Sequence, residues 1–348
     1  MKTKIIRVLS DKSHGAGIAG REIRRGGLVA FPTETVYGLG ANGLDGEAVK
    51  RIFEVKGRPN DNPLILHVAR KTDARALWRE VPEVAEKLMD AFWPGPLTLI
   101  YYKSDIVPPE VTAGLDTVAV RIPDSETATF IIRMAGVPIA APSANLSGKP
   151  SPTLAKHVID DFMGKINVIV DGGPCRVGVE STVVSLTGDK PMILRPGGIT
   201  KEMLESVVGE VEVSPAVLRP LLDGEKAESP GMKHRHYAPN CEVLVVKADI
   251  EETKKITKRE YMSAVFAHKN TVILATKQTE DCYKDVFKYT TIGDREHPDT
   301  LCRNLFSALR MYSDSVDLII AEAVEPKGEG LAYMNRLLRA AGFKIIDK

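Results

Sequence analysis

The stretch Thr117-Val118-Ala119-Val120-Arg121-Ile122-Pro123 carries the pattern that decides the fold of this chain. It is short, rich in valine and closed by a proline, which is typical of a β-strand after which the chain turns away. Similar runs recur through the first half of the sequence. We expect strands at Leu28–Phe31, Leu64–Val68, Leu97–Tyr102, Val118–Ile122, Ile139–Ala141, Val168–Val170, Thr182–Leu186 and Met192–Leu194.

Apolar residues at helical spacing occur between some of these strands but not between others. They predict helices at Ala48–Val55, Val84–Phe92, Thr127–Ala135 and Thr153–Phe162, and Asp45 is a suitable N-terminal cap for the first. Strands that sometimes follow one another and sometimes enclose a helix indicate a mixed sheet. We therefore predict an α/β (α+β) domain over residues 1–208.

The C-terminal third alternates strand and helix more regularly. Strands are expected at Glu242–Val246, Val272–Ala275, Phe287–Thr291 and Leu318–Ala321, with helices at Thr300–Ser313 and Gly330–Ala341. This alternation predicts a small, Rossmann-like parallel α/β domain over residues 241–348. The sequence contains no G-x-x-x-x-G-K-[ST] motif, and no G-x-G-x-x-G follows a strand, so neither phosphate-binding fingerprint is present.

Composition and charge place the protein among globular chains. Of its 348 residues, 43% are hydrophobic and 27% charged, and the formal net charge of +1 means that any anion site must be local. The cysteines Cys175, Cys241, Cys282 and Cys302 are scattered without a C-x-x-C pair, which indicates neither a zinc knuckle nor a disulfide framework. The N-terminal residues lack the apolar segment of a signal peptide, so a cytoplasmic enzyme or binding protein is expected.

Two short polar motifs are candidates for binding an anion. Lys56 and Arg58 stand two residues apart before Pro59, as do Ser143 and Asn145 after a proline. In extended backbone such pairs point to one side, so the motifs could form a receptor for a polyanion, most plausibly a triphosphate. The alternative is a solvated basic pair and an ordinary turn.

Other candidates have equally ordinary alternatives. Arg121, at the end of its apolar strand, could grip a carboxylate or could be a solvated strand-end arginine. His67 lies inside an apolar strand, where a core histidine is the commoner outcome. The segment Ser229–Pro239 is dense in polar and aromatic side chains, so it is either a plain linker or a linker that contacts a ligand.

Several motifs, in order, resemble those of the YrdC-like family of threonylcarbamoyl-AMP synthases. The linker and the C-terminal alternation look like the longer, two-domain form of that family. The motifs are Gly27-Leu28-Val29-Ala30-Phe31-Pro32-Thr33-Glu34-Thr35-Val36-Tyr37-Gly38-Leu39, Lys56-Gly57-Arg58-Pro59 with Asn62-Pro63-Leu64, Phe92-Trp93-Pro94-Gly95-Pro96-Leu97-Thr98, Val120-Arg121-Ile122-Pro123, Ala141-Pro142-Ser143-Ala144-Asn145, Ser181-Thr182-Val183 and Arg195-Pro196-Gly197.

The resemblance implies a fold, a reaction and a set of site residues. The fold would be a twisted mixed sheet with helices around a large basic cavity, and residues 209–240 would be a linker and lid over it. The reaction would join L-threonine, bicarbonate or CO2, and ATP into threonylcarbamoyl-AMP and pyrophosphate, for the threonylcarbamoyl modification of adenosine in tRNA. Mg2+ would be carried on the ATP phosphates, with no metal ligand from protein side chains.

By the same resemblance, the residues divide into two groups. Lys56, Arg58, Ser143 and Asn145 would be catalytic and hold the triphosphate; further ATP contacts would be Asn60, Thr117, Ser151, Arg195, Arg235, His236 and Tyr237. L-threonine would contact Thr33, His67, Arg121, Ala141 and Ser181. His234 departs from the family, in which an aromatic residue is frequent at that position.

Two other functions remain open at this point. The first is an RNA-binding module for tRNA or double-stranded RNA, against which the small net charge and the aromatic content of 6% argue. The second is a carbamoyltransferase with a different acceptor. For the synthase, the expected partners besides the substrates are tRNA and a downstream threonylcarbamoyl-transfer complex; no membrane partner is expected.

Overall fold

The structure is a computed structural model and describes residues 2–8, 12–220 and 236–348. The chain divides into two compact units. Among the described residues, the first unit runs to Val217 without Gly148–Pro150. The second contains residues 236–348 together with Gly148–Pro150 and Leu218–Pro220. The predicted boundaries at residues 208 and 240 stay predictions.

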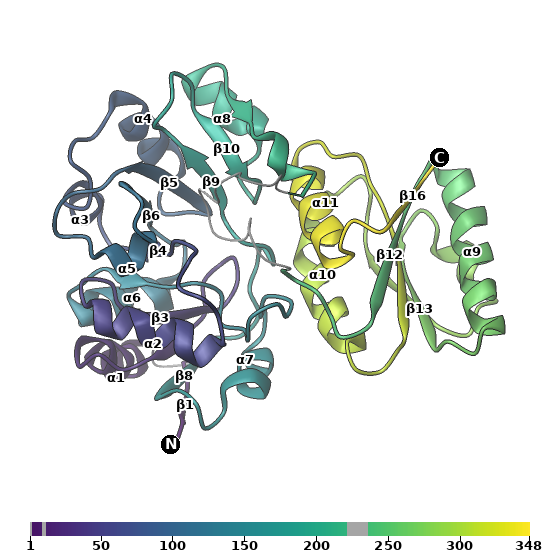
Figure 1. The fold of residues 1–348 in the computed structure, drawn as a ribbon, viewed down its shortest axis with the longest axis horizontal. Helices are drawn as coiled ribbons and strands as arrows, with labels where there is room; N and C mark the ends of the chain where they lie inside the picture. The colour runs from purple at the N-terminus through teal and green to yellow at the C-terminus, as the bar shows by residue number, and fades with distance from the viewer. Residues whose placement is uncertain (1, 9–11, 221–235) are drawn as a thin grey trace. The chain divides into compact units, whose positions relative to one another are not determined.

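The first unit is built on one mixed sheet (Figure 1). The strand order is β1-β8-β2-β3-β7-β4-β6-β5-β9-β10-β11, and parallel and antiparallel pairs are interspersed along it. The strands are β1 (Lys4–Arg7), β2 (Val29–Phe31), β3 (Gly38–Asn42), β4 (Ile65–His67), β5 (Leu97–Tyr102), β6 (Thr117–Arg121), β7 (Ile139–Ala140), β8 (Val168–Asp171), β9 (Thr182–Ser185), β10 (Met192–Arg195) and β11 (Glu212–Val213).

Both faces of this sheet are buried, because alternate residues of a strand enter different apolar clusters. In β2, Val29 and Phe31 join one cluster, whereas Ala30 joins the other. Helices supply the opposite walls of both clusters (Figure 1). The helices of the first unit are α1 (Lys12–Arg24), α2 (Gly46–Lys56), α3 (Lys71–Arg75), α4 (Glu83–Phe92), α5 (Pro109–Thr112), α6 (Glu126–Ala135), α7 (Ala155–Phe162) and α8 (Lys201–Val208), and the unit also contains the 3-10 turn η1 (Pro215–Val217).

The second unit is a fully parallel sheet in the order β14-β13-β15-β12-β16. Helix α9 covers one face, and α10 and α11 cover the other (Figure 1). The elements are β12 (Glu242–Lys247), α9 (Ile250–Phe266), β13 (Thr271–Thr276), η2 (Glu280–Tyr283), β14 (Tyr289–Gly293), α10 (Pro298–Tyr312), β15 (Leu318–Glu322), α11 (Glu329–Ala340) and β16 (Ile345–Asp347).

A buried carboxylate at the end of β15 holds the loops of the second unit together. Glu322 accepts hydrogen bonds from Thr276 Oγ1 at 2.8 Å, Thr279 Oγ1 at 2.9 Å and Tyr283 OH at 2.7 Å. Arg295 Nη2 lies 3.0 Å away and supplies the opposite charge. A fully buried charge is tolerated only when it is paired and hydrogen-bonded in this way.

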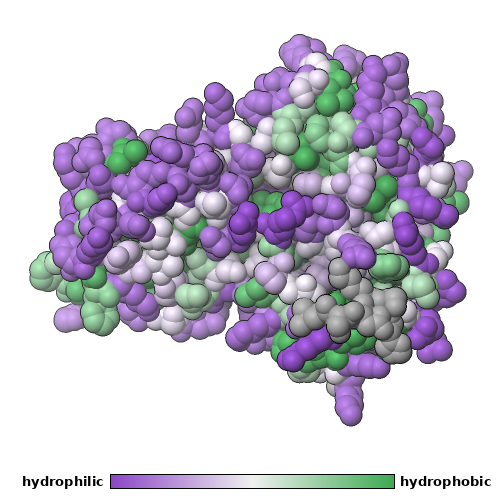
Figure 2. All heavy atoms as spheres, turned by 180° about the vertical axis from the view of Figure 1, so that it is seen from behind, coloured by the Kyte–Doolittle hydropathy of each residue, from purple (hydrophilic) through white to green (hydrophobic). Residues whose placement is uncertain are grey.

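The predicted fold class is confirmed: a mixed α/β sheet is followed by a parallel one. The sequence missed strands β1, β3, β11 and β16 and helices α1, α3, α5 and α8. In the described part of the chain, no helix is long and apolar enough to cross a membrane. On the face drawn in Figure 2, hydrophilic residues predominate and apolar residues form small separate patches.

Candidate active site

Lys56 joins the two polar motifs, although they are far apart in the sequence. It is the last residue of α2, and it is buried. Its Nζ donates to Ser143 O at 2.6 Å and to Asn145 O at 2.5 Å, while Ser143 Oγ donates to Asn145 Oδ1 at 2.6 Å. The ammonium group therefore fixes the loop after β7 and gives it a positive charge.

The extended backbone predicted for the Lys56–Arg58 segment is wrong. Gly57 ends α2 in the left-handed conformation, with φ 63° and ψ 41°. The N–H of Arg58 turns back to Phe53 O at 3.0 Å, and its guanidinium lies 5.9 Å from the centre of the Phe53 ring. The helix continues to Lys56 because Asp45 caps its N-terminus and a glycine is available for its C-terminus.

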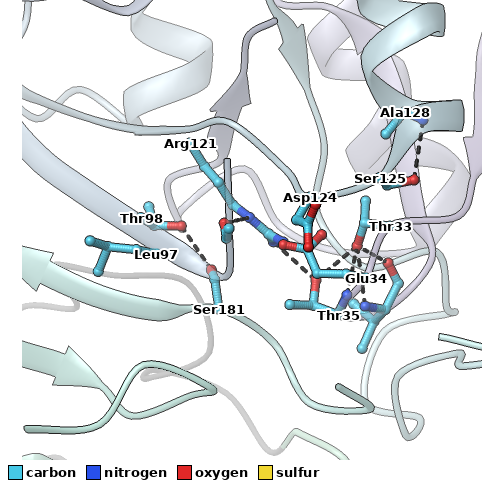
Figure 3. Close-up of polar contacts among 12 residues, drawn as sticks. Thr33, Glu34, Thr35, Leu97, Thr98, Arg121, Asp124, Ser125, Ala128 and Ser181 are labelled. Carbon is cyan, nitrogen blue, oxygen red and sulfur yellow. Dashed lines mark hydrogen bonds and ion pairs between the residues drawn. The ribbon is translucent and has the colours of Figure 1, made fainter. Parts of the chain in front are cut away.

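A second polar cluster surrounds Arg121, at the end of β6 (Figure 3). The guanidinium is buried; its Nε donates to Gly95 O at 3.2 Å and its Nη1 to Thr35 Oγ1 at 3.0 Å. Its Nη2 lies 2.5 Å from Glu34 Oε1. Thr35 in turn bonds Thr33, whose Oγ1 donates to Val36 O at 2.7 Å. Arg121 is thus a buried, held cation, not a solvated one.

A second buried arginine stands at the end of β10. Arg195 Nε donates to Ser181 O and its Nη2 to Ser181 Oγ, both at 3.1 Å. Ser181 Oγ also lies 2.7 Å from Thr98 Oγ1 (Figure 3). Arg121 and Arg195 thus present positive charge from two strands of the same sheet.

His67 lies on β4 directly opposite Arg121 of β6 in the parallel register. Burial, and then the charges of Arg121 and Arg195, lower the pKa of His67 to about 3. Its Nδ1 lies 3.2 Å from Ile65 O, and its ring meets that of Phe31 edge to face. His67 is therefore a buried histidine that stays neutral beside two cations. It adds no positive charge to the site.

The remaining predicted contacts of the first unit lie in different settings. Ser151 is fully buried and donates its hydroxyl to the Glu180 carboxylate. Ala141 follows β7, where its N–H donates to Ile65 O at 3.0 Å. Thr117 begins β6 and is half-buried, whereas Asn60 is exposed in the loop after α2.

The predicted linker contacts fall partly outside the described residues, as His234 and Arg235 do. Tyr237 belongs to the second unit, where its ring lies 5.1 Å from that of Phe306 and 5.7 Å from the Arg336 guanidinium. His236 precedes it, with ring centres 5.7 Å apart. Their proposed contact with a nucleotide stays a prediction.

Sequence reasoning missed the residues that hold the predicted ones. Glu34 and Thr35 bind Arg121, Thr98 bonds Ser181, and Glu180 bonds Ser151. The one available signal was the run Thr33-Glu34-Thr35, since three consecutive polar residues between apolar strands are costly to bury without partners.

The clusters together suit an anionic substrate with a carboxylate or phosphate. Lys56, Arg121 and Arg195 are all buried cations, and a cation in a poorly hydrated site attracts anions more strongly than one in water. The Cys175 thiol offers no nucleophile, because burial and the nearby Glu34 carboxylate raise its pKa. Among the residues described, no group of three or more His, Cys, Asp or Glu side chains could hold a metal ion.

Comparisons with known proteins agree over nearly the whole length. Residues 21–197 match the family described as "Telomere recombination", and residues 199–342 match "Threonylcarbamoyl-AMP synthase, C-terminal domain". The chain is 53% identical over 330 residues to a threonylcarbamoyl-AMP synthase of Pyrococcus abyssi, covering 94% of both chains. It is 48% identical over 327 residues to one of Bacillus subtilis, covering 93% of this chain and 92% of that one.

A solved structure is similar over the full chain. The crystal structure of P. abyssi Sua5 complexed with L-threonine matches with a TM-score of 0.93 and 48% identity, covering 100% of both chains. The sequence and structural similarities therefore extend over both units.

Proposed function

The chain belongs to the threonylcarbamoyl-AMP synthase family, and from this we propose that it makes threonylcarbamoyl-AMP and pyrophosphate from L-threonine, bicarbonate or CO2, and ATP. The product would serve the threonylcarbamoyl modification of adenosine in tRNA. The single observation in the structure that best supports this function is Arg121, a buried cation held on three sides at a strand end. The alternatives, an RNA-binding module and a carbamoyltransferase with another acceptor, are not favoured by any of these matches.

In this proposal, Arg121 binds the carboxylate of threonine. The P. abyssi relative was crystallised with L-threonine, which supports an amino-acid pocket here. Thr33, His67, Ala141 and Ser181 would complete that pocket. Neutral His67 suits this role, since it can donate or accept a hydrogen bond without adding a charge.

ATP would bind at Lys56, Arg58, Ser143 and Asn145. Asn60, Thr117, Ser151, Arg195 and, from the linker, Arg235, His236 and Tyr237 would add contacts. The carbamate of threonine then attacks the α-phosphorus and pyrophosphate leaves, a meeting of two anions that buried cations favour. Lys56 would supply a fixed positive charge next to the phosphate chain.

Mg2+ would neutralise part of the phosphate charge when bound with ATP. The described residues near Lys56 offer carbonyl, hydroxyl and amide oxygens but no carboxylate cluster, so they fit an ion carried mainly by phosphate oxygens. We further propose a contact with tRNA, a downstream transfer complex as a partner and a cytoplasmic location. Residues 209–240 would form a lid; of that segment, residues 221–235 lie outside the described part.

The function is tested by pyrophosphate release. The protein is incubated with ATP, Mg2+, bicarbonate and each amino acid in turn. Release that depends on threonine supports the synthase, whereas tRNA retention without turnover would support the RNA-binding alternative.

Replacement of Arg121 tests the assignment of the threonine pocket. Arg121→Ala should raise the KM for threonine at least about 100-fold, because a charge-assisted contact with the substrate carboxylate is lost. The KM for ATP should change much less. Exposed Arg70→Ala is the matched control, and an unchanged threonine KM in Arg121→Ala would refute the role of Arg121.

A further inference from the structure

Glu34 is a buried carboxylate whose two oxygens have no hydrogen-bond partner among the described residues. Its side chain is 2% exposed, and it lies in the turn between β2 and β3. It approaches Arg121 Nη2 to 2.5 Å, but without the geometry of a hydrogen bond. A buried carboxylate normally accepts several hydrogen bonds, so this one requires an explanation.

The neighbours of Glu34 are already bonded elsewhere. Arg121 directs Nε to Gly95 and Nη1 to Thr35, which leaves Nη2 facing Glu34. Asp124 is a nearby carboxylate (Figure 3), but it is about half exposed and pairs with Arg176 at 2.7 Å. The Glu34–Arg121 pair is therefore a negative and a positive charge, side by side and held from behind.

A zwitterionic α-amino acid matches this pair, because its carboxylate and ammonium are only two bonds apart across Cα. The substrate carboxylate would bind Nη2 of Arg121. The substrate ammonium would donate hydrogen bonds to the carboxylate oxygens of Glu34, which now face Arg121. We propose that Glu34 is a catalytic residue that binds the substrate ammonium and accepts its proton. This role rests on the proposed function, whose carboxylation step needs a neutral amine.

Proton transfer to Glu34 prepares the threonine nitrogen for carboxylation. One N–H bond of the threonine ammonium breaks, its electron pair stays on nitrogen, and the proton passes to a Glu34 oxygen. The nitrogen pair then forms the N–C bond to CO2, and one C=O pair moves onto oxygen. The nitrogen loses a second proton to solvent, which leaves a carbamate. Attack of a carbamate oxygen on the α-phosphorus expels pyrophosphate, and Glu34 returns its proton to solvent.

The other titratable groups of the cluster are poor proton acceptors. His67 is a weak base, since its pKa is lowered to about 3. Cys175 stays a thiol because burial raises its pKa. The Glu180 carboxylate already accepts the hydroxyl of Ser151. Among the described residues of this cluster, Glu34 is the buried carboxylate whose oxygens accept no hydrogen bond and contact only the Arg121 guanidinium as an ion pair.

The test compares the two directions of the reaction in the full chain. Forward synthesis from threonine needs the proton acceptor. The reverse reaction, in which threonylcarbamoyl-AMP and pyrophosphate give ATP and the carbamate, changes bonds only at phosphorus. Glu34→Gln should therefore lower the forward kcat at least about 100-fold, the usual share of a general base. Its single-turnover reverse rate should stay within about threefold of wild type.

Two further variants sharpen the result. Glu34→Asp keeps a carboxylate and should recover part of the forward rate, whereas exposed Glu83→Gln in α4 should match wild type. An equal loss in both directions, or a raised threonine KM with unchanged kcat, would overturn the proposal and leave Glu34 a positioning residue. If the wild type is active and Glu34→Gln is equally active, the catalytic role of Glu34 is refuted and the proposed function stands. A wild type that releases no threonine-dependent pyrophosphate would refute the proposed function and this role with it.

Discussion

At the scale of single residues, the site is defined by charges that burial makes strong. Arg121 and Arg195 are each held by backbone and hydroxyl oxygens. His67 lies near both, and a third positive charge there would be repelled in a poorly hydrated interior. The histidine therefore stays neutral, and the positive charges of this cluster are those of the two arginines.

The neutral state of His67 predicts a pH-dependent stability. The pKa of His67 is about 3 in the folded protein and 6.5 in the unfolded chain. Between these pH values, only the unfolded chain binds the proton. The free energy of unfolding should then rise with pH across this window, by up to about 1.4 kcal/mol per pH unit from this group. His67→Gln should lower this slope, measured by urea unfolding between pH 4 and 6, by close to the amount that one bound proton contributes.

A matched variant separates this effect from the titration of carboxylates. Exposed His268 has a φ of 58°, so His268→Asn suits its backbone and should leave the slope as it is in wild type. If His67→Gln and His268→Asn gave the same slope, His67 would not be the group that titrates.

The sequence predicts the charged residues of the site better than it predicts the residues that bind them. Arg121 could be singled out because an arginine ending an apolar strand is conspicuous. Glu34 could not, because its importance comes from Arg121, which is far away in the chain and adjacent only in the folded sheet. The same holds for Thr98 of β5, whose bonding partner Ser181 directly precedes the neighbouring strand β9.

At the scale of elements, the end of α2 sets the direction of Arg58. Gly57 adopts a left-handed φ of 63°, and a Cβ there would meet no atom within 4 Å. Gly57→Ala should therefore cost about 1 kcal/mol in the free energy of unfolding, purely from backbone strain. It should also weaken ATP binding, because alanine holds less readily the left-handed turn that sets the direction of Arg58. Urea unfolding and the dissociation constant for ATP measure the two effects.

A glycine without this constraint provides the control. Gly188 lies outside the left-handed region, and its nearest neighbour to an added Cβ is 3.7 Å away. Gly188→Ala should leave both quantities near wild type. Equal ATP affinity in Gly57→Ala and wild type would show that the conformation of Gly57 does not direct Arg58.

Two of the elements that the sequence missed, α1 and β3, contain glycines that obscure their pattern. Helix α1 contains Gly15, Gly17 and Gly20, which lower helix propensity. A Cβ on Gly20 would lie 2.6 Å from Met134 Cβ and 2.7 Å from Ala135 N, so the glycine permits close packing on α6. Strand β3 likewise contains Gly38 and Gly40. Only tertiary contacts explain these glycines, so local patterns could not reveal the elements.

At the scale of the whole molecule, each unit has an apolar core of its own. On the α9 side of the parallel sheet, the core of the second unit contains residues of the sheet and of α9, among them the fully buried Ile320 of β15. The mixed sheet has separate clusters, to which Leu66 of β4 contributes. Because a buried side chain stabilises the elements that it packs against, separate cores predict that each unit unfolds cooperatively on its own.

Native-state hydrogen exchange can test this independence with two matched truncations. Ile320→Ala should destabilise the second unit by about 2–5 kcal/mol and speed exchange in β12, β13 and β15. Leu66→Ala should do the same for β4, β6 and β7. Each should leave the amides of the other unit unchanged. If either variant accelerated exchange in both sheets by the same factor, the two units would unfold together as one cooperative unit.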